Sequence, residues 1–228
     1  MNYLQLCQAV ARDSGTVSGT QPASVSSQTG RLQKIVELVA EAWNRIQLDR
    51  PNWRWMWTDF TGATLAGTGS YTPAALNLTR VRRWDTDADA LTVYLTATGV
   101  SDEHPVTFME WAEFRRKYRR GEQTANRPVA WSVNPSNNAI ELGPVPDDAY
   151  TLNGAFWKSE QTLAANTDIP ELPAEHHRVI KWLAVALLHG MDEGLPASAI
   201  ATGHYRSYLD KLERNQLDPF AFAMEPLA

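Results

Sequence analysis

The acidic run from Asp85 to Asp89 places carboxylates at alternate positions, as in the first half of a calcium-binding loop. Such a loop also needs a glycine at its sixth position for a sharp turn and a bidentate glutamate at its twelfth. Those positions hold Ala90 and Thr96 in this sequence. Because both the turn residue and the strongest ligand are replaced, the run predicts an acidic hairpin turn and no calcium site.

Histidine and cysteine can bind metals or act as nucleophiles, but their spacing here fits neither role. His176 and His177 are adjacent, so on a helix their side chains diverge by about 100° and cannot share a metal ion. Cys7 is the single cysteine, which excludes an intrachain disulfide, and it falls on the apolar face of the first expected helix. We therefore predict a buried thiol with a raised pKa, and neither a metal nor a cofactor.

The glycine and serine patterns of common enzymes are also missing. No G-x-S-x-G motif occurs, and Gly62, Gly67 and Gly69 are not followed by the Lys-Ser/Thr of a phosphate-binding loop. We therefore predict that the chain is not an enzyme. The alternative is a small enzyme whose active site is assembled from scattered residues of the middle segment.

The densest group of charges ends an expected helix over about 108–120. Five cations surround Tyr118 there: Arg115, Arg116, Lys117, Arg119 and Arg120. Cations at a helix C-terminus are favoured by the helix dipole, so a solvated or locally paired face is one interpretation. The other interpretation is contact with DNA in a channel or with an acidic partner. Both interpretations stay open on the sequence alone.

The last twelve residues contain two prolines and cannot continue the helix that precedes them. Disordered tails usually lack large apolar residues. This tail carries four of them: Phe220, Phe222, Met224 and Leu227. We weigh two roles for the segment, which are packing against its own chain and docking in a groove or on a sheet edge of another subunit.

Length and composition are those of an ordinary globular protein. The 228 residues include 21 Lys and Arg against 26 Asp and Glu, a net charge of −5. This sign is wrong for a protein that grips nucleic acid with its whole surface. The longest apolar run, Trp182 to Leu188, is too short to span a membrane, and we expect no signal peptide. Nine tryptophans supply large side chains that suit a core or an interface.

Helices are expected at both ends of the chain. Asn2 can cap a first helix that ends near Asp13, and apolar residues at helical spacing predict a second over about 31–48. At the other end, Pro173 precedes a third helix and a fourth covers about 197–216. The simplest arrangement packs the two pairs of helices into one bundle.

Between these helices the period of the sequence changes to two. Trp53, Trp55 and Trp57 occupy alternate positions, which predicts a strand. One helix, begun by a capping box of Thr107 and Glu110, interrupts the strand-rich segment. Further strands are expected over 78–84, 90–96, 129–133, 139–142 and 150–157.

The predicted fold class is α+β, with a helical bundle formed by the N- and C-terminal helices and a β-rich insertion in the middle. We divide the chain into N-terminal bundle helices over 1–52, a β-rich insertion with one helix over 53–160, C-terminal bundle helices over 161–216, and an extended tail over 217–228.

Three stretches share the order of elements and the pattern of residue types of one known family. They are Ser27–Gln47 leading into Trp53 and Trp55, Tyr150–Pro173 with its strand and acidic, proline-bearing approach to a helix, and Glu175–Gly194 followed by Tyr205, Tyr208 and Leu212. Together they resemble the head-to-tail adaptor proteins of tailed bacteriophages, also called connector or head-completion proteins. The segment over about 58–127 matches this pattern least.

The resemblance implies a structural protein of the virion neck. Such proteins form a ring, typically of twelve copies, that joins the portal of the capsid to the tail and leaves a channel for double-stranded DNA. The implied partners are the portal protein, tail or neck proteins and further copies of the chain. The implied locations are the virion neck and, during assembly, the host cytoplasm. The C-terminal segment commonly reaches into the portal, which would make the four apolar tail residues portal-docking residues.

Three alternatives stay open beside this interpretation. One is another phage tail or neck component, such as a terminator or a fibre-attachment protein. The second is the small enzyme described above. The third is a DNA-binding regulator, for which affinity would fall steeply with salt.

Overall fold

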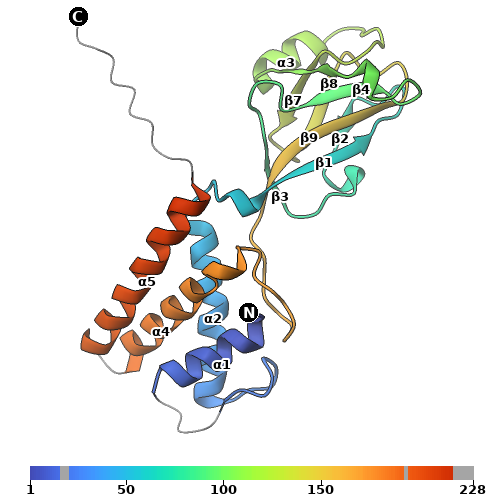
Figure 1. The fold of residues 1–228 in the computed structure, drawn as a ribbon. Helices are drawn as coiled ribbons and strands as arrows, with labels where there is room; N and C mark the ends of the chain where they lie inside the picture. The colour runs from blue at the N-terminus through green and yellow to red at the C-terminus, as the bar shows by residue number, and fades with distance from the viewer. Residues whose placement is uncertain (16–20, 193–194, 218–228) are drawn as a thin grey trace, which may run out of the picture. The chain divides into compact units, whose positions relative to one another are not determined.

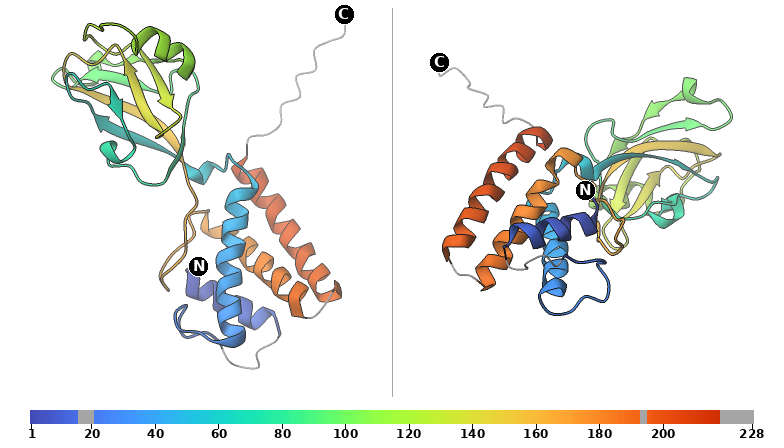
Figure 2. Two further views of the ribbon diagram at one scale, coloured as in Figure 1. Left: turned by 180° about the vertical axis from the view of Figure 1, so that it is seen from behind. Right: turned by 60° about the horizontal axis from the view of Figure 1, so that its bottom comes forward.

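The computed structural model describes residues 1–15, 21–192 and 195–217 of the chain (Figures 1 and 2). These residues form two compact units. The helical unit combines Met1–Trp55 with the chain from Glu160 onward, and the β unit is Met56–Ser159. The predicted α+β fold class, with a β-rich part inserted between N- and C-terminal helices that pack together, is confirmed.

Among the described residues, the helical unit contains α1 (Tyr3–Asp13), α2 (Gly30–Asp49), α4 (Arg178–Asp192) and α5 (Leu195–Gln216), and a 3-10 turn, η4 (Ala174–His176), leads into α4. The predicted cap of α1 is confirmed. Asn2 Oδ1 accepts the backbone N–H of Gln5 at 2.8 Å, and the Gln5 side chain accepts the Asn2 N–H in return. Helices α1, α2 and α4 pack on one another, and α5 packs along α4 as a hairpin (Figure 1).

The strand predicted from the alternating tryptophans is wrong before Trp57, because Arg54–Met56 form a 3-10 turn, η1. Trp53 is buried, and its indole N–H donates to the Ile46 carbonyl at 2.8 Å. Its ring stacks on that of Trp55 with 4.6 Å between the centroids. Both tryptophans therefore pack with the end of α2. The two-residue spacing of Trp53 and Trp55 belongs to the chain that enters the turn and does not mark a strand.

The β unit contains two sheets. Sheet A has the order β1 (Trp57–Ala63), β9 (Tyr150–Lys158), β4 (Thr92–Leu95) and β5 (His104–Pro105), and β3 (Val81–Trp84) pairs with the end of β9. Sheet B has the order β2 (Ser70–Tyr71), β8 (Ala139–Gly143), β7 (Ala130–Asn134) and β6 (Thr107–Phe108). All pairs are antiparallel except β6 with β7. The turns η2 (Ala74–Leu76) and η3 (Val100–Asp102) lie in the connections.

One apolar core joins the inner faces of the two sheets. Sheet A contributes Phe60, Trp84, Val93, Leu152 and Phe156, and sheet B contributes Tyr71, Trp131, Ile140 and Leu142. Because side chains alternate along a strand, the neighbours of these residues point away from the core. Sheet A therefore has an outer face that carries Asp59 and Asn153, and sheet B has an outer face that carries Ser132 and Glu141.

Helix α3 (Trp111–Tyr118) covers the outer face of sheet B (Figures 1 and 2). It is shorter than the predicted helix over 108–120, and the predicted capping box is wrong. Thr107 and Phe108 pair with β7 as strand β6, and the Glu110 side chain makes no capping hydrogen bond. Phe114 is fully buried under the helix, and the Tyr118 ring lies directly against Gly143 of β8.

Candidate assembly surfaces

The predicted basic cluster lies in and just after the last turn of α3, on the outside of sheet B. All five cations are exposed, and four of them lack a carboxylate partner that the structure shows: Arg115, Arg116, Lys117 and Arg120. Lys117 Nζ lies 5.2 Å from the centroid of the Tyr118 ring. Among the described residues, no carboxylate lies within ion-pair distance of Arg115, Arg116 or Arg120. These four residues are called the basic helix end below.

Arg119, the fifth predicted cation, has a structural role instead. Its guanidinium pairs with Glu141, a carboxylate of the outer face of sheet B that is only 3% exposed. Ser70 and Asn134 also donate to Glu141 Oε1, at 3.0 and 3.1 Å. Partial burial lowers the pKa of Arg119, which nevertheless stays charged. Arg119 thus anchors α3 to sheet B, and the local-pairing interpretation applies to this one residue.

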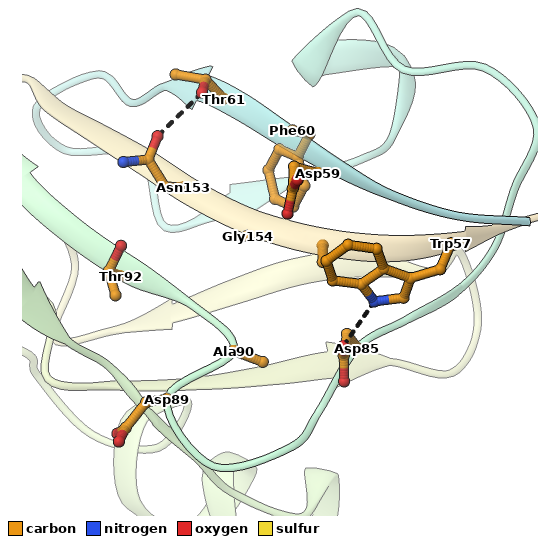
Figure 3. A pocket seen from close by; sticks show the side chains of 11 residues that line it. Trp57, Asp59, Phe60, Thr61, Asp85, Asp89, Ala90, Thr92, Asn153 and Gly154 are labelled. Atoms are coloured by element: carbon orange, nitrogen blue, oxygen red, sulfur yellow. Dashed lines mark hydrogen bonds between the residues drawn. The ribbon is translucent and has the colours of Figure 1, made fainter. Parts of the chain in front are cut away.

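The outer face of sheet A forms an open hollow of about 450 Å³, shown in Figure 3. Trp57, Asp59 and Thr61 of β1 line one side, and Asp85 and Asp89 of the β3–β4 turn line the other. The Trp57 indole N–H donates to Asp85 Oδ2 at 2.8 Å, and Trp57 is 40% exposed. These three aspartates, together with Glu103 beside them, are called the acidic face below.

Hydrogen bonds favour the ionised form of Glu103. Thr92 and Asn153, which both line the hollow, donate to Glu103 Oε1. Their hydrogen bonds lower the pKa of Glu103, because they favour the ionised carboxylate. One cation lies at the end of the same outer face, where the Arg83 guanidinium stacks 4.7 Å from the Trp157 ring centroid. The charged side chains that line the hollow are the three aspartates; the rest of its lining is aromatic, polar or small.

The predicted acidic turn is present, since the Ala90 N–H donates to the Asp87 carbonyl at 3.1 Å. It is not the predicted hairpin, because β3 and β4, which it joins, do not pair with each other and follow one another along the same edge of β9. Its position beside Asp59 was not predicted. The two segments meet only because β9 pairs with β1 on one edge and with β3 and β4 on the other. In the sequence, the alternation of Trp57, Asp59 and Thr61 indicates that these residues share one face of a strand, but it does not indicate which strands lie beside it.

Two buried titratable groups of the helical unit, Cys7 and His177, have shifted pKa values. Burial raises the pKa of Cys7 to about 12, as predicted. His177 is also buried; its Nε2 lies 3.1 Å from the Leu172 carbonyl and its Nδ1 lies 2.6 Å from the N-terminal ammonium. Burial and that ammonium lower the pKa of His177. No three His, Cys, Asp or Glu side chains of the described residues are grouped as metal ligands.

The predicted docking residues of the tail, Phe220, Phe222, Met224 and Leu227, lie outside the described residues. Their role stays a prediction. In the described helices, no segment is both long and apolar enough to cross a lipid bilayer.

Comparison with protein families decides the class of this chain. The family model for the SU10 adaptor protein matches residues 1–225, which covers both units and the segment over 58–127 where the sequence pattern was weakest. The chain belongs to the SU10 adaptor protein family. This is a phage head–tail adaptor family, so the adaptor is a structural protein that binds other virion proteins. No curated protein matches the adaptor.

Proposed function

We propose that this adaptor forms an oligomeric ring in the virion neck, joins the portal of the capsid to the tail, and leaves a channel for DNA. The observation that carries the proposal is the match of an adaptor family to nearly the whole chain. The expected absence of a catalytic centre, a metal and a cofactor belongs to the same proposal.

Exposed apolar side chains support a role in large permanent contacts. Met191 of α4 and Ile200 of α5 are 61% and 68% exposed, and Leu48 at the end of α2 is 52% exposed. Large side chains of this kind are common at subunit interfaces, where burial is worth about 25 cal/mol for each Å² removed from water. In the proposed ring, the bundle helices make contacts between subunits, and the β unit faces outward or toward the tail.

The tail after α5 completes the proposal. Its four apolar residues, Phe220, Phe222, Met224 and Leu227, dock on the portal, and assembly takes place in the host cytoplasm. Deletion of residues 220–228 is expected to leave thermal unfolding unchanged but to weaken binding to the portal by tenfold or more. Unchanged binding of the truncated chain would contradict this role of the tail.

The ring is tested by measuring the light-scattering mass of the adaptor alone, of the portal ring alone, and of the two mixed. Twelve copies of a 25.5 kDa chain would add roughly 306 kDa to one portal. Absence of added mass at several salt concentrations would contradict the portal role. It would favour another tail or neck position, such as a terminator or a fibre attachment.

A further inference from the structure

We propose that the acidic face of one copy of the adaptor binds the basic helix end of the next copy. The proposal rests on the proposed ring and specifies a contact between neighbouring β units. Its occupant is a second copy of this chain, and the residues that meet are Asp59, Asp85 and Asp89 on one side and Arg115, Arg116 and Arg120 on the other.

The first argument is that the two surfaces lie on opposite sides of one compact unit. Asp59 lies on the outer face of sheet A, since its neighbour Phe60 is in the core. Glu141 and Gly143 lie on the outer face of sheet B, and α3 is fixed there through Arg119 and Tyr118. The order through the β unit is therefore acidic face, sheet A, core, sheet B and basic helix end (Figures 1 and 3).

This order decides the geometry of association. A single subunit cannot bring its own two surfaces together, because both sheets and the core separate them. Two subunits can, and the contact is then head-to-tail: each copy uses a different surface toward each of its two neighbours. Head-to-tail contacts generate a closed ring when the rotation between copies closes, which is the symmetry that an adaptor ring requires.

The second argument is the match in chemistry. Asp59 and Asp89 of the hollow have no ion-pair partner among the described residues. The guanidinium groups of Arg115, Arg116 and Arg120 on the opposite surface have no ion-pair partner there either. Arginine pairs with carboxylates through two parallel hydrogen bonds and also stacks on aromatic rings. Trp57, exposed at the rim of the hollow, supplies such a ring. Arginine and tryptophan are also the residues that contribute most at protein interfaces.

In this proposal the basic helix end contacts the acidic face of the neighbouring copy and does not contact DNA. The carboxylates that would neutralise it are present in every copy, at a matching position of the same unit. Glu113, one turn earlier on α3, is the one acidic residue within the helix and is exposed as well. Contact with DNA is the competing explanation and is separated by the experiment below.

Charge reversal in the full chain tests the contact. One variant carries Asp59→Arg with Asp89→Arg, a second carries Arg115→Glu with Arg116→Glu, and a third combines all four changes. None of these side chains makes a hydrogen bond or an ion pair within the described residues. Asp89 has a φ of 62°, which arginine adopts less readily than aspartate, so thermal unfolding checks that each variant folds. Asp148→Arg, compared with the single variant Asp59→Arg, is the control, since it changes the net charge by the same amount at an exposed position of the β unit off both surfaces.

The readout is the adaptor concentration that half-saturates the portal ring, together with the number of copies bound. Each two-residue reversal should raise that concentration at least about tenfold, because like charges then meet at the contact. The four-residue variant should return to within about threefold of the unchanged chain. An equal mixture of the two reversed variants should also recover, since alternating copies again pair opposite charges. The control should match the unchanged chain.

Three results would overturn the contact. The two reversed variants could fill the ring as the unchanged chain does, or the four-residue variant could be no better than the weaker of the two. Alternatively, only the arginine reversal could have an effect, confined to the retention of packaged DNA, which would assign the basic helix end to DNA. Failure of the unchanged chain to bind the portal would instead contradict the proposed function, so the two failures are distinguishable.

Discussion

Gly143→Ala is expected to destabilise the β unit, because the Tyr118 ring of α3 occupies the space that a side chain would need. A Cβ built on Gly143 would lie 2.5, 2.7 and 2.9 Å from Cγ, Cδ2 and Cδ1 of that ring. Ordinary contacts of a Cβ begin at 3.4 Å, so the ring must move by about 0.9 Å. The Tyr118 ring lies 5.2 Å from the ring of the fully buried Phe114, centroid to centroid and tilted by 40°, and the next residue, Arg119, holds α3 on Glu141. Displacement of the Tyr118 ring therefore disturbs the contacts of Phe114 and Arg119 that hold α3 on sheet B.

Overpacking of this kind costs about 1–3 kcal/mol. The substitution of glycine by alanine also stabilises a protein by about 0.4–1 kcal/mol through the unfolded chain, where the backbone conformation permits it. We therefore expect the free energy of unfolding to fall by about 1–2 kcal/mol, measured in urea by circular dichroism. Gly203→Ala in α5 is the matched control, since no atom lies within 4 Å of the added Cβ. That variant should be more stable than the unchanged chain by up to about 1 kcal/mol.

A double-mutant cycle isolates the clash. In a Tyr118→Ala background the ring is gone, so Gly143→Ala should become neutral or stabilising, with a coupling of at least about 1 kcal/mol. If the two substitutions are additive, or if Gly143→Ala and Gly203→Ala stabilise the chain equally, then Tyr118 does not set the position of α3 as described.

Two further predictions concern buried groups of the helical unit. Cys7 should resist maleimides and disulfide reagents at pH 8 in the folded protein and react fully in denaturant, because burial raises its pKa to about 12; rapid labelling of the native chain would contradict this. Because the pKa of His177 is lowered in the folded state, the unfolded chain takes up a proton that the folded chain does not as the pH falls through about 6.5. The free energy of unfolding should therefore decrease below pH 6.5 by up to about 1.4 kcal/mol per pH unit, and a His177→Gln variant with the same slope would show that another group is responsible.

The helices were predictable because their signals are local. Asn2 and Gln5 lie within one turn of each other, and the apolar stripe of α2 can be read along twenty residues without reference to any other segment. The start of α3 was not predictable in this way. Thr107 and Glu110 satisfy a capping pattern, but Thr107 pairs with Ala130, so a backbone ladder to a distant strand replaced the first helical turn.

The candidate surfaces show the same division. The five cations around Tyr118 were evident from the sequence, but the pairing of Arg119 with Glu141, which separates it from the other four, joins residues from two different elements. The acidic face depends on β9, which lies between β1 on one edge and β3 and β4 on the other. β9 is distant from β1 in the sequence, since Trp57 pairs with Trp157. Composition and periodicity do not indicate which strands lie side by side, and this information comes from the strand register in the structure.

The pairing of β1 with β9 has a consequence for how this chain can diversify. Trp57 lies opposite Trp157, so the positions where the chain enters and leaves the β unit are neighbours in one antiparallel ladder. Residues opposite each other in such a ladder are only about 5 Å apart. The two ends of the helical unit that connect to the β unit are therefore only about as far apart as the ends of a tight turn, whatever segment is inserted between them. Insertions, deletions and even exchange of the whole β unit can accumulate between Met56 and Ser159 without changing the distance that α2 and α4 must keep.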